Sequence, residues 1–129
     1  MTKLSVLVLV LVFALASAFG QTPEVPKYTL TTEASFKGTV EEVRDRQCSM
    51  IGGMGSHLIL RLPTGKTIEV HLASTKFVKM YDLVLKKGDS VEVVGIQVKF
   101  EDAETIFARE IIRGNETFTF RDNEGKPIW

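Results

Sequence analysis

The chain has 129 residues, and its 16 basic and 16 acidic side chains give a formal net charge of zero. A chain of this length is expected to form one small domain with one hydrophobic core. The balanced charge disfavours nucleic acid as a partner, because proteins that bind nucleic acid present a basic surface to the phosphates. Cys48 is the single cysteine, so an intramolecular disulfide is excluded.

The first eighteen residues predict a secretory signal peptide. Lys3 precedes an apolar run over residues 4–16, and Ala16-Ser-Ala18 supplies the small residues that signal peptidase requires. The run is short for a membrane span, and no cysteine follows it as a point of lipid attachment. We therefore expect cleavage after Ala18 and a mature protein that is periplasmic or secreted and has no membrane anchor.

Residues 19–34 carry two prolines and no hydrophobic period, so they predict an extended leader ahead of a domain over residues 35–129. In residues 35–43, apolar side chains alternate with polar ones until Glu41-Glu42 shifts the phase. That shift predicts a bulge in a long first strand.

Residues 57–62 and 67–72 predict two strands joined by a tight turn that contains a proline and a glycine. We expect a register that places three apolar pairs on one face: Leu62 with Ile68, Leu60 with Val70, and Leu58 with Leu72. The same register sets Arg61 opposite Glu69 on the other face.

The later elements follow in chain order. They are a short helix over residues 76–81 capped by Ser74 or Thr75, a strand over 90–100 bent at Gly95, a strand over 105–112, and a terminal hairpin of 117–120 with 126–129.

Three strands, a helical link and two further strands are the plan of the OB-fold, an all-β, five-stranded, partly open Greek-key barrel. We therefore expect an OB-fold-like barrel with a short helix between the third and fourth strands and a C-terminal hairpin. Alternation of apolar and polar residues predicts that eight side chains lie inside this barrel: Val40, Leu58, Leu60, Ile68, Val70, Val91, Val93 and Ile106.

Several short motifs together resemble one family. They are Gly53-Met-Gly-Ser-His-Leu58, Val70-His-Leu72, Gly88-Asp-Ser-Val-Glu-Val-Val-Gly95 and Arg121-Asp-Asn-Glu-Gly-Lys-Pro-Ile-Trp129. The chain resembles, over about residues 36–129, small extracytoplasmic bacterial domains related to the C-terminal domain of the magnetosome proteins MamS and MamX. The resemblance implies the OB-fold and a secreted, non-catalytic domain. Proteins of the MamX kind also carry Cys-x-x-Cys-His haem attachment sites, and this chain has none.

One cluster of side chains has ligand chemistry. We expect residues 47–57 to form a glycine-rich loop that carries Cys48, Met50, Met54 and His57. In the expected register, His57 and His71 lie diagonally on the outward face of the hairpin. Imidazoles with thioethers and a thiolate suit copper(I). The alternative is that the methionines only fill gaps beneath the loop and the histidines are only solvated.

The outward face of the same hairpin is the usual binding face of an OB-fold. We expect five side chains on it: His57, Ile59, Arg61, Glu69 and His71. This set is mixed in polarity and lacks the aromatic row on which bases stack. A protein, a peptide or a saccharide is therefore a better candidate partner than nucleic acid.

Catalytic groups are not indicated. Cys48 with His57 or His71 is the one conceivable nucleophile and base, and the spacing implies no third residue to orient the base. We therefore expect a secreted or periplasmic binding domain that is not an enzyme, needs no cofactor, and has an unidentified partner. Copper binding or handling is the alternative function.

Overall fold

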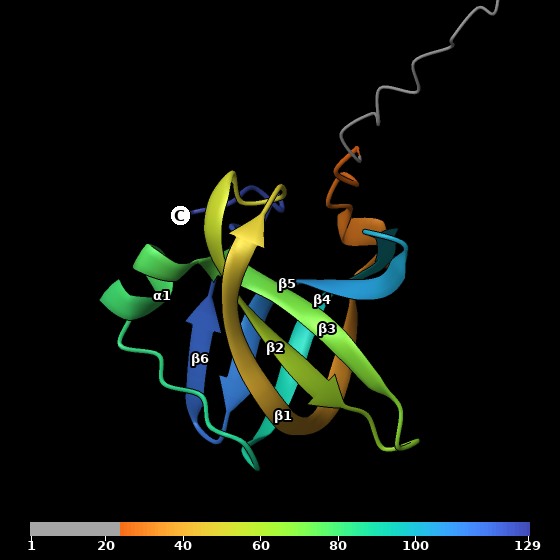
Figure 1. The fold of residues 1–129 in the computed structure, drawn as a ribbon, viewed down its shortest axis with the longest axis vertical. Coiled ribbons are helices and arrows are strands. Elements are labelled where there is room, and N and C mark those ends of the chain that lie inside the picture. The colour runs from red at the N-terminus through yellow and green to blue at the C-terminus, as the bar shows by residue number, and fades with distance from the viewer. Residues whose placement is uncertain (1–23) are drawn as a thin grey trace, which may run out of the picture.

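The computed structural model describes residues 24–129, so the predicted signal peptide and the first residues of the leader lie outside the described residues. Six strands and one short helix make up the fold (Figure 1). In chain order the elements are a 3-10 turn η1 (Leu30–Thr32), β1 (Ala34–Cys48), β2 (Gly53–Arg61), β3 (Thr67–Ser74), α1 (Thr75–Met80), β4 (Ser90–Phe100), β5 (Ala103–Arg113) and β6 (Glu116–Thr119).

The strands form one sheet in the order β3-β2-β1-β4-β5-β6, and a parallel pairing of β3 with β5 closes it into a ring. In Figure 1 the strands curve around a common interior and α1 lies outside it. The first five strands have the connectivity of an OB-fold. We expected five strands and a separate terminal hairpin of residues 117–120 with 126–129. Residues 116–119 instead pair with β5 as a sixth strand of the sheet, and the hairpin is reduced to an isolated bridge between Arg121 and Pro127.

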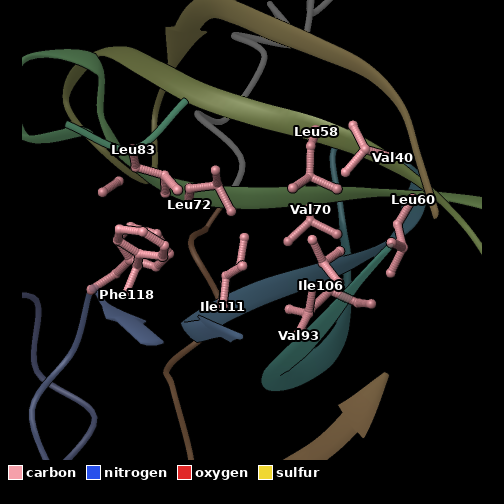
Figure 2. Packing of buried hydrophobic residues seen from close by; sticks show 14 of the residues in the cluster. Val40, Leu58, Leu60, Val70, Leu72, Leu83, Val93, Ile106, Ile111 and Phe118 are labelled. Carbon is pink, nitrogen blue, oxygen red and sulfur yellow. The ribbon is translucent and has the colours of Figure 1, made fainter. Parts of the chain in front are cut away.

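The predicted core is confirmed. All eight side chains that alternation placed inside the barrel are buried and belong to one cluster. Figure 2 shows Val40, Leu58, Leu60 and Val70 packing toward Val93 and Ile106, with Phe118 at the other end of the cluster. Ser74 caps α1 by accepting a hydrogen bond from the Phe77 amide, and the helix begins and ends one residue before the expected range.

The expected register of the β2–β3 hairpin was wrong by two residues. Leu60 pairs with Ile68, Leu58 with Val70, and Ile59 rather than Arg61 lies opposite Glu69. The turn decides this register: Gly65 has a φ of 86° and its amide donates to the Leu62 carbonyl. Glycine tolerates this left-handed conformation, which a three-residue hairpin loop requires at one position.

The β1–β2 hairpin is longer than expected. The register of the two strands shifts between Val40 and Glu42, which confirms the predicted bulge. Beyond the bulge, β1 continues to Cys48 and β2 starts at Gly53. The segment over residues 47–57, expected to be a loop, is therefore mostly strand, with a turn of only residues 49–52.

A second apolar cluster covers part of the outer face of the sheet. It consists of Tyr28, Cys48, Ile96, Phe100 and Phe107, with Met50, Ile51 and Val98 packed against it. Successive side chains of a strand point to opposite faces. Since Ile106 lies in the main core, its neighbour Phe107 belongs to the outer cluster.

The described part of the leader packs on the domain. Tyr28 is buried in the outer cluster, and its hydroxyl donates to Glu33. Glu33 also accepts two hydrogen bonds from the Arg109 guanidinium of β5, each 2.8 Å long. Residues 28–33 are therefore fixed against β5.

Candidate metal centre

Three adjacent strands place a cysteine and two histidines together. Cys48 is the last residue of β1, while His57 of β2 and His71 of β3 are directly opposite each other in the hairpin. The sequence predicted a diagonal arrangement of the two histidines. The two-residue change in register makes them direct partners instead.

The three side chains are within contact distance. Cys48 Sγ lies 3.2 Å from Nδ1 of His71, and the two imidazole rings meet edge to face with centroids 4.3 Å apart. The potential ligand atoms of Cys48, His57 and His71 all lie within 4.8 Å of one another. Bonds of about 2.0 Å to nitrogen and about 2.3 Å to sulfur separate the ligands of one metal ion by roughly 3.3–3.8 Å. A small inward movement would therefore bring all three to one ion.

Both histidines are buried, so the expectation that they lie on an exposed face is wrong. His57 is 0% and His71 is 1% exposed. The rings of Phe100 and Phe107 pack against His71, and the end of β1 brings Cys48 onto the same face. The face on which the histidines lie is therefore interior to the protein at this end of the hairpin.

The rest of the expected binding face is ion-paired or partly covered. Arg61 is exposed and pairs with Glu41, Glu69 pairs with Arg46, and Ile59 is half-buried. The five side chains expected on one face therefore divide into a buried pair of histidines and three side chains nearer the surface.

Burial controls the protonation of the three groups. It lowers the pKa of His71 to about 3, with a further contribution from His57. Burial also lowers the pKa of His57 and raises that of the Cys48 thiol. Both imidazoles are therefore neutral at physiological pH and keep a nitrogen lone pair for a ligand. A metal ion would displace the thiol proton, because the thiolate is the metal ligand.

The two ring nitrogens of His57 have no hydrogen-bond partner within the described residues, although both are buried. His71 differs, because its Nδ1 faces the thiol and its Nε2 lies 3.8 Å from a carboxylate oxygen of Glu69. In metal sites, the ring nitrogen of a histidine that does not bind the metal usually contacts a carboxylate that is not itself a ligand, here called the outer carboxylate.

Arg46 fixes this outer carboxylate. Its guanidinium donates to Glu69 at 2.6 and 2.9 Å and to Glu101, in the β4–β5 turn, at 3.0 Å. Sequence reasoning missed Arg46 and Glu101, which are far from the histidines in the chain. Alternation along β1 places Arg46 on the same face as Cys48, which is the one signal that could have identified it.

The structure brings together three of the five predicted metal ligands. Met54 is 46% exposed and lies opposite Gln47 in the β1–β2 ladder. Met50 is half-buried, and its sulfur accepts a hydrogen bond from Arg121 at 3.7 Å. Neither thioether therefore belongs to the Cys48, His57 and His71 group.

Gly55 leaves room beside the cluster. A Cβ atom at this position would lie 2.2 Å from Cδ1 of Ile51 and 3.3 Å from both Cβ of Cys48 and Cε1 of His57. A side chain here would therefore displace Ile51 and crowd two of the three ligands. The glycines of this segment led us to expect a loop. Gly55 instead lies in β2, where its missing side chain leaves space for the cluster.

The closed sheet, its strand order and the enclosed sulfur and imidazole donors define an OB-fold domain with a candidate metal centre. The chain belongs to the MamS/MamX magnetosome protein family, whose sequence pattern matches residues 32–118. No curated protein matches the chain. Within residues 24–129, the short α1 and η1 are the helical elements, and neither has the length and apolar character of a transmembrane helix.

Among solved structures, the chain is similar to the N-terminal domain of the PriB protein from Thermoanaerobacter tencongensis, which was solved as a dimer. The two share 18% sequence identity with a TM-score of 0.47, over 67% of this chain and 99% of that one.

Proposed function

We propose that this protein is a non-catalytic OB-fold binding domain that works outside the cytoplasm, and that the ligand it binds is copper(I). One observation carries the proposal: Cys48, His57 and His71 place their donor atoms within 4.8 Å of one another in a buried site. The extracytoplasmic location rests on the signal-peptide pattern of residues 1–18.

The unpartnered His57 is the strongest sign of a ligand. A buried polar atom without a hydrogen bond costs about 1–3 kcal/mol of stability. Phe or Leu would fill the same space without this cost. A metal ion bound to one nitrogen of His57 would replace the missing partner and offset the cost.

The donor set favours a soft ion of low coordination number. Thiolate and imidazole ligands suit copper, whereas calcium and magnesium require oxygen ligands. Structural zinc sites use four protein ligands. Among residues 24–129, only these three side chains form a His, Cys, Asp or Glu group with this spacing, and we assign the site to three-coordinate copper(I).

A competition titration with a copper(I) chelator, under anaerobic conditions, tests the proposal. The wild type should bind one copper(I) per chain. Cys48→Ser should weaken binding by more than about 100-fold. Glu69→Gln, which removes the carboxylate beside His71 and its ion pair with Arg46, should weaken it by roughly 10–100-fold. Met54→Leu is the matched control, because this side chain is exposed, whereas the three ligands are buried.

Circular dichroism should establish that each variant is folded before its affinity is compared. Equal copper(I) affinity for the wild type and Cys48→Ser would overturn the proposal. A loss of affinity in Met54→Leu as large as that in Cys48→Ser would place the site elsewhere in the β1–β2 hairpin.

A further inference from the structure

Arg121 is a buried cation without a carboxylate partner. The residue is 6% exposed, and no carboxylate in residues 24–129 lies within 4.0 Å of its guanidinium. One terminal nitrogen donates to the Gly125 carbonyl at 2.9 Å, and the other donates to the Met50 sulfur at 3.7 Å. Nε is buried and has no hydrogen-bond partner among these same residues. A guanidinium has five N–H donors, so most of this capacity is unused.

Two aromatic rings hold the guanidinium in place. Its central carbon lies 4.8 Å from the ring centroid of Tyr28 and 5.1 Å from that of Trp129. Such contacts stabilise the positive charge but accept no in-plane N–H hydrogen bond. Glu33, the acid beside Tyr28, already accepts hydrogen bonds from Tyr28 and Arg109. The charge of Arg121 therefore has no anionic partner in this part of the protein.

Arg121 lies in the wall of a surface pocket of about 440 Å³, between the leader and the C-terminal turn. Lys27 and Lys126 also line the pocket, and Glu124 is its one acidic residue. Because Glu124 pairs with Lys126 at 3.0 Å, the pocket keeps an excess of positive charge. Val25, Pro26 and Pro127 supply an apolar wall.

We propose that this pocket binds a small organic carboxylate, independently of any metal at Cys48. The carboxylate pairs with the unused N–H donors on the two terminal nitrogens of Arg121, and an apolar body lies against the valine and the prolines. Arginine matches a carboxylate with two parallel hydrogen bonds. The pocket volume falls within the range of small-molecule sites, which combine an apolar lining with a few polar groups.

Trp129 is the only tryptophan of the chain and contacts Arg121, so its fluorescence reports on the pocket. Hexanoate should change this fluorescence along a saturable curve. Hexanamide, its uncharged counterpart of equal length, should produce no saturable change. Inorganic phosphate should bind more weakly than hexanoate, because it has no apolar body.

Arg121→Gln should weaken hexanoate binding by at least about tenfold, since it removes a charged donor. Arg44→Gln is the control, because Arg44 is exposed and its ion-pair partner in the described part of the chain is Glu42. If Arg121→Gln does not fold, NMR of the wild type gives a measurement without a variant. Hexanoate, but not hexanamide, should then shift the indole N–H resonance of Trp129.

Three results would overturn the proposal. They are the absence of a saturable response to hexanoate, an equal response to hexanamide, and phosphate binding as tight as hexanoate binding.

Discussion

The imidazole of His71 is neutral because water cannot reach it. Its pKa is about 3 in the folded protein, against an ordinary value of 6.5 that applies when the chain is unfolded. Between these two values the unfolded chain binds a proton at His71 and the folded chain does not. The contribution of the neutral His71 to the free energy of unfolding is therefore fully present above about pH 6.5 and is lost as the pH falls toward 3. His57 shifts in the same direction.

The metal-free protein should lose stability between about pH 7.5 and about pH 5.0, by on the order of 2 kcal/mol for His71 alone. The chain has two histidines, and histidine is the side chain whose ordinary pKa lies within this range, so we expect the histidines to dominate the change. Urea unfolding at both pH values measures it. The variant with both His57→Phe and His71→Phe should lose much less, and a pH-independent wild type would contradict the burial of neutral imidazoles.

Gly95 allows β4 and β5 to approach closely. A Cβ atom at this position would lie 2.2 Å from the backbone carbonyl oxygen of Phe107. Gly95→Ala should therefore destabilise the protein by more than about 2 kcal/mol, because backbone rather than a flexible side chain would have to move. Gly53→Ala is the control, since nothing lies within 4 Å of its Cβ position. Equal thermal midpoints for the two variants would contradict the close approach.

For the elements, side-chain alternation was a sufficient guide to which strand positions face the core. Leu58, Leu60 and Val70 were placed correctly even though the pairing of their strands was not. A shift of two residues keeps every side chain on its original face, so hydrophobic pattern alone cannot choose between the two registers. The backbone conformation of Gly65 makes that choice, and the sequence does not encode it uniquely.

Two substitutions at neighbouring positions test which side chains of β2 face the core. Leu60→Ala should cost about 2–5 kcal/mol of unfolding free energy, because the side chain is fully buried in the main core. Ile59→Ala should cost much less, because Ile59 is half-buried on the opposite face of β2. Chemical denaturation of both variants tests this. A larger loss of unfolding free energy for Ile59→Ala than for Leu60→Ala would contradict this assignment of the core-facing side of β2.

At the scale of the whole molecule, the candidate site depends on segments that are far apart in the chain. The sequence singled out Cys48, His57 and His71 as candidate ligands from their residue types, and the structure brings these three side chains together. It could not reveal their burial. Phe100 and Phe107 from the β4–β5 hairpin cover that face, and a local pattern carries no information about such distant contacts.

The overall charge predicts that the protein binds nucleic acid only weakly. The formal net charge is zero, and Phe100 and Phe107 are buried rather than presented for base stacking. Single-stranded DNA or RNA should therefore bind only weakly and in a salt-sensitive way. Fluorescence anisotropy with a labelled oligonucleotide at physiological salt measures this, and micromolar binding under those conditions would contradict it.

The pairing of β3 with β5 has a consequence for kinetics. It joins Val70 to Ile106 and His71 to Phe107, residues far apart in the chain, so the entropy of loop closure delays its formation during folding. His71 pairs with Phe107, whose ring packs against the imidazole, so the proposed copper site reaches its buried form only after the ring has closed. A ligand bound to an arrangement absent from the folding transition state slows unfolding without accelerating folding. Stopped-flow measurements should therefore give a slower unfolding rate for the copper-loaded protein and an unchanged refolding rate.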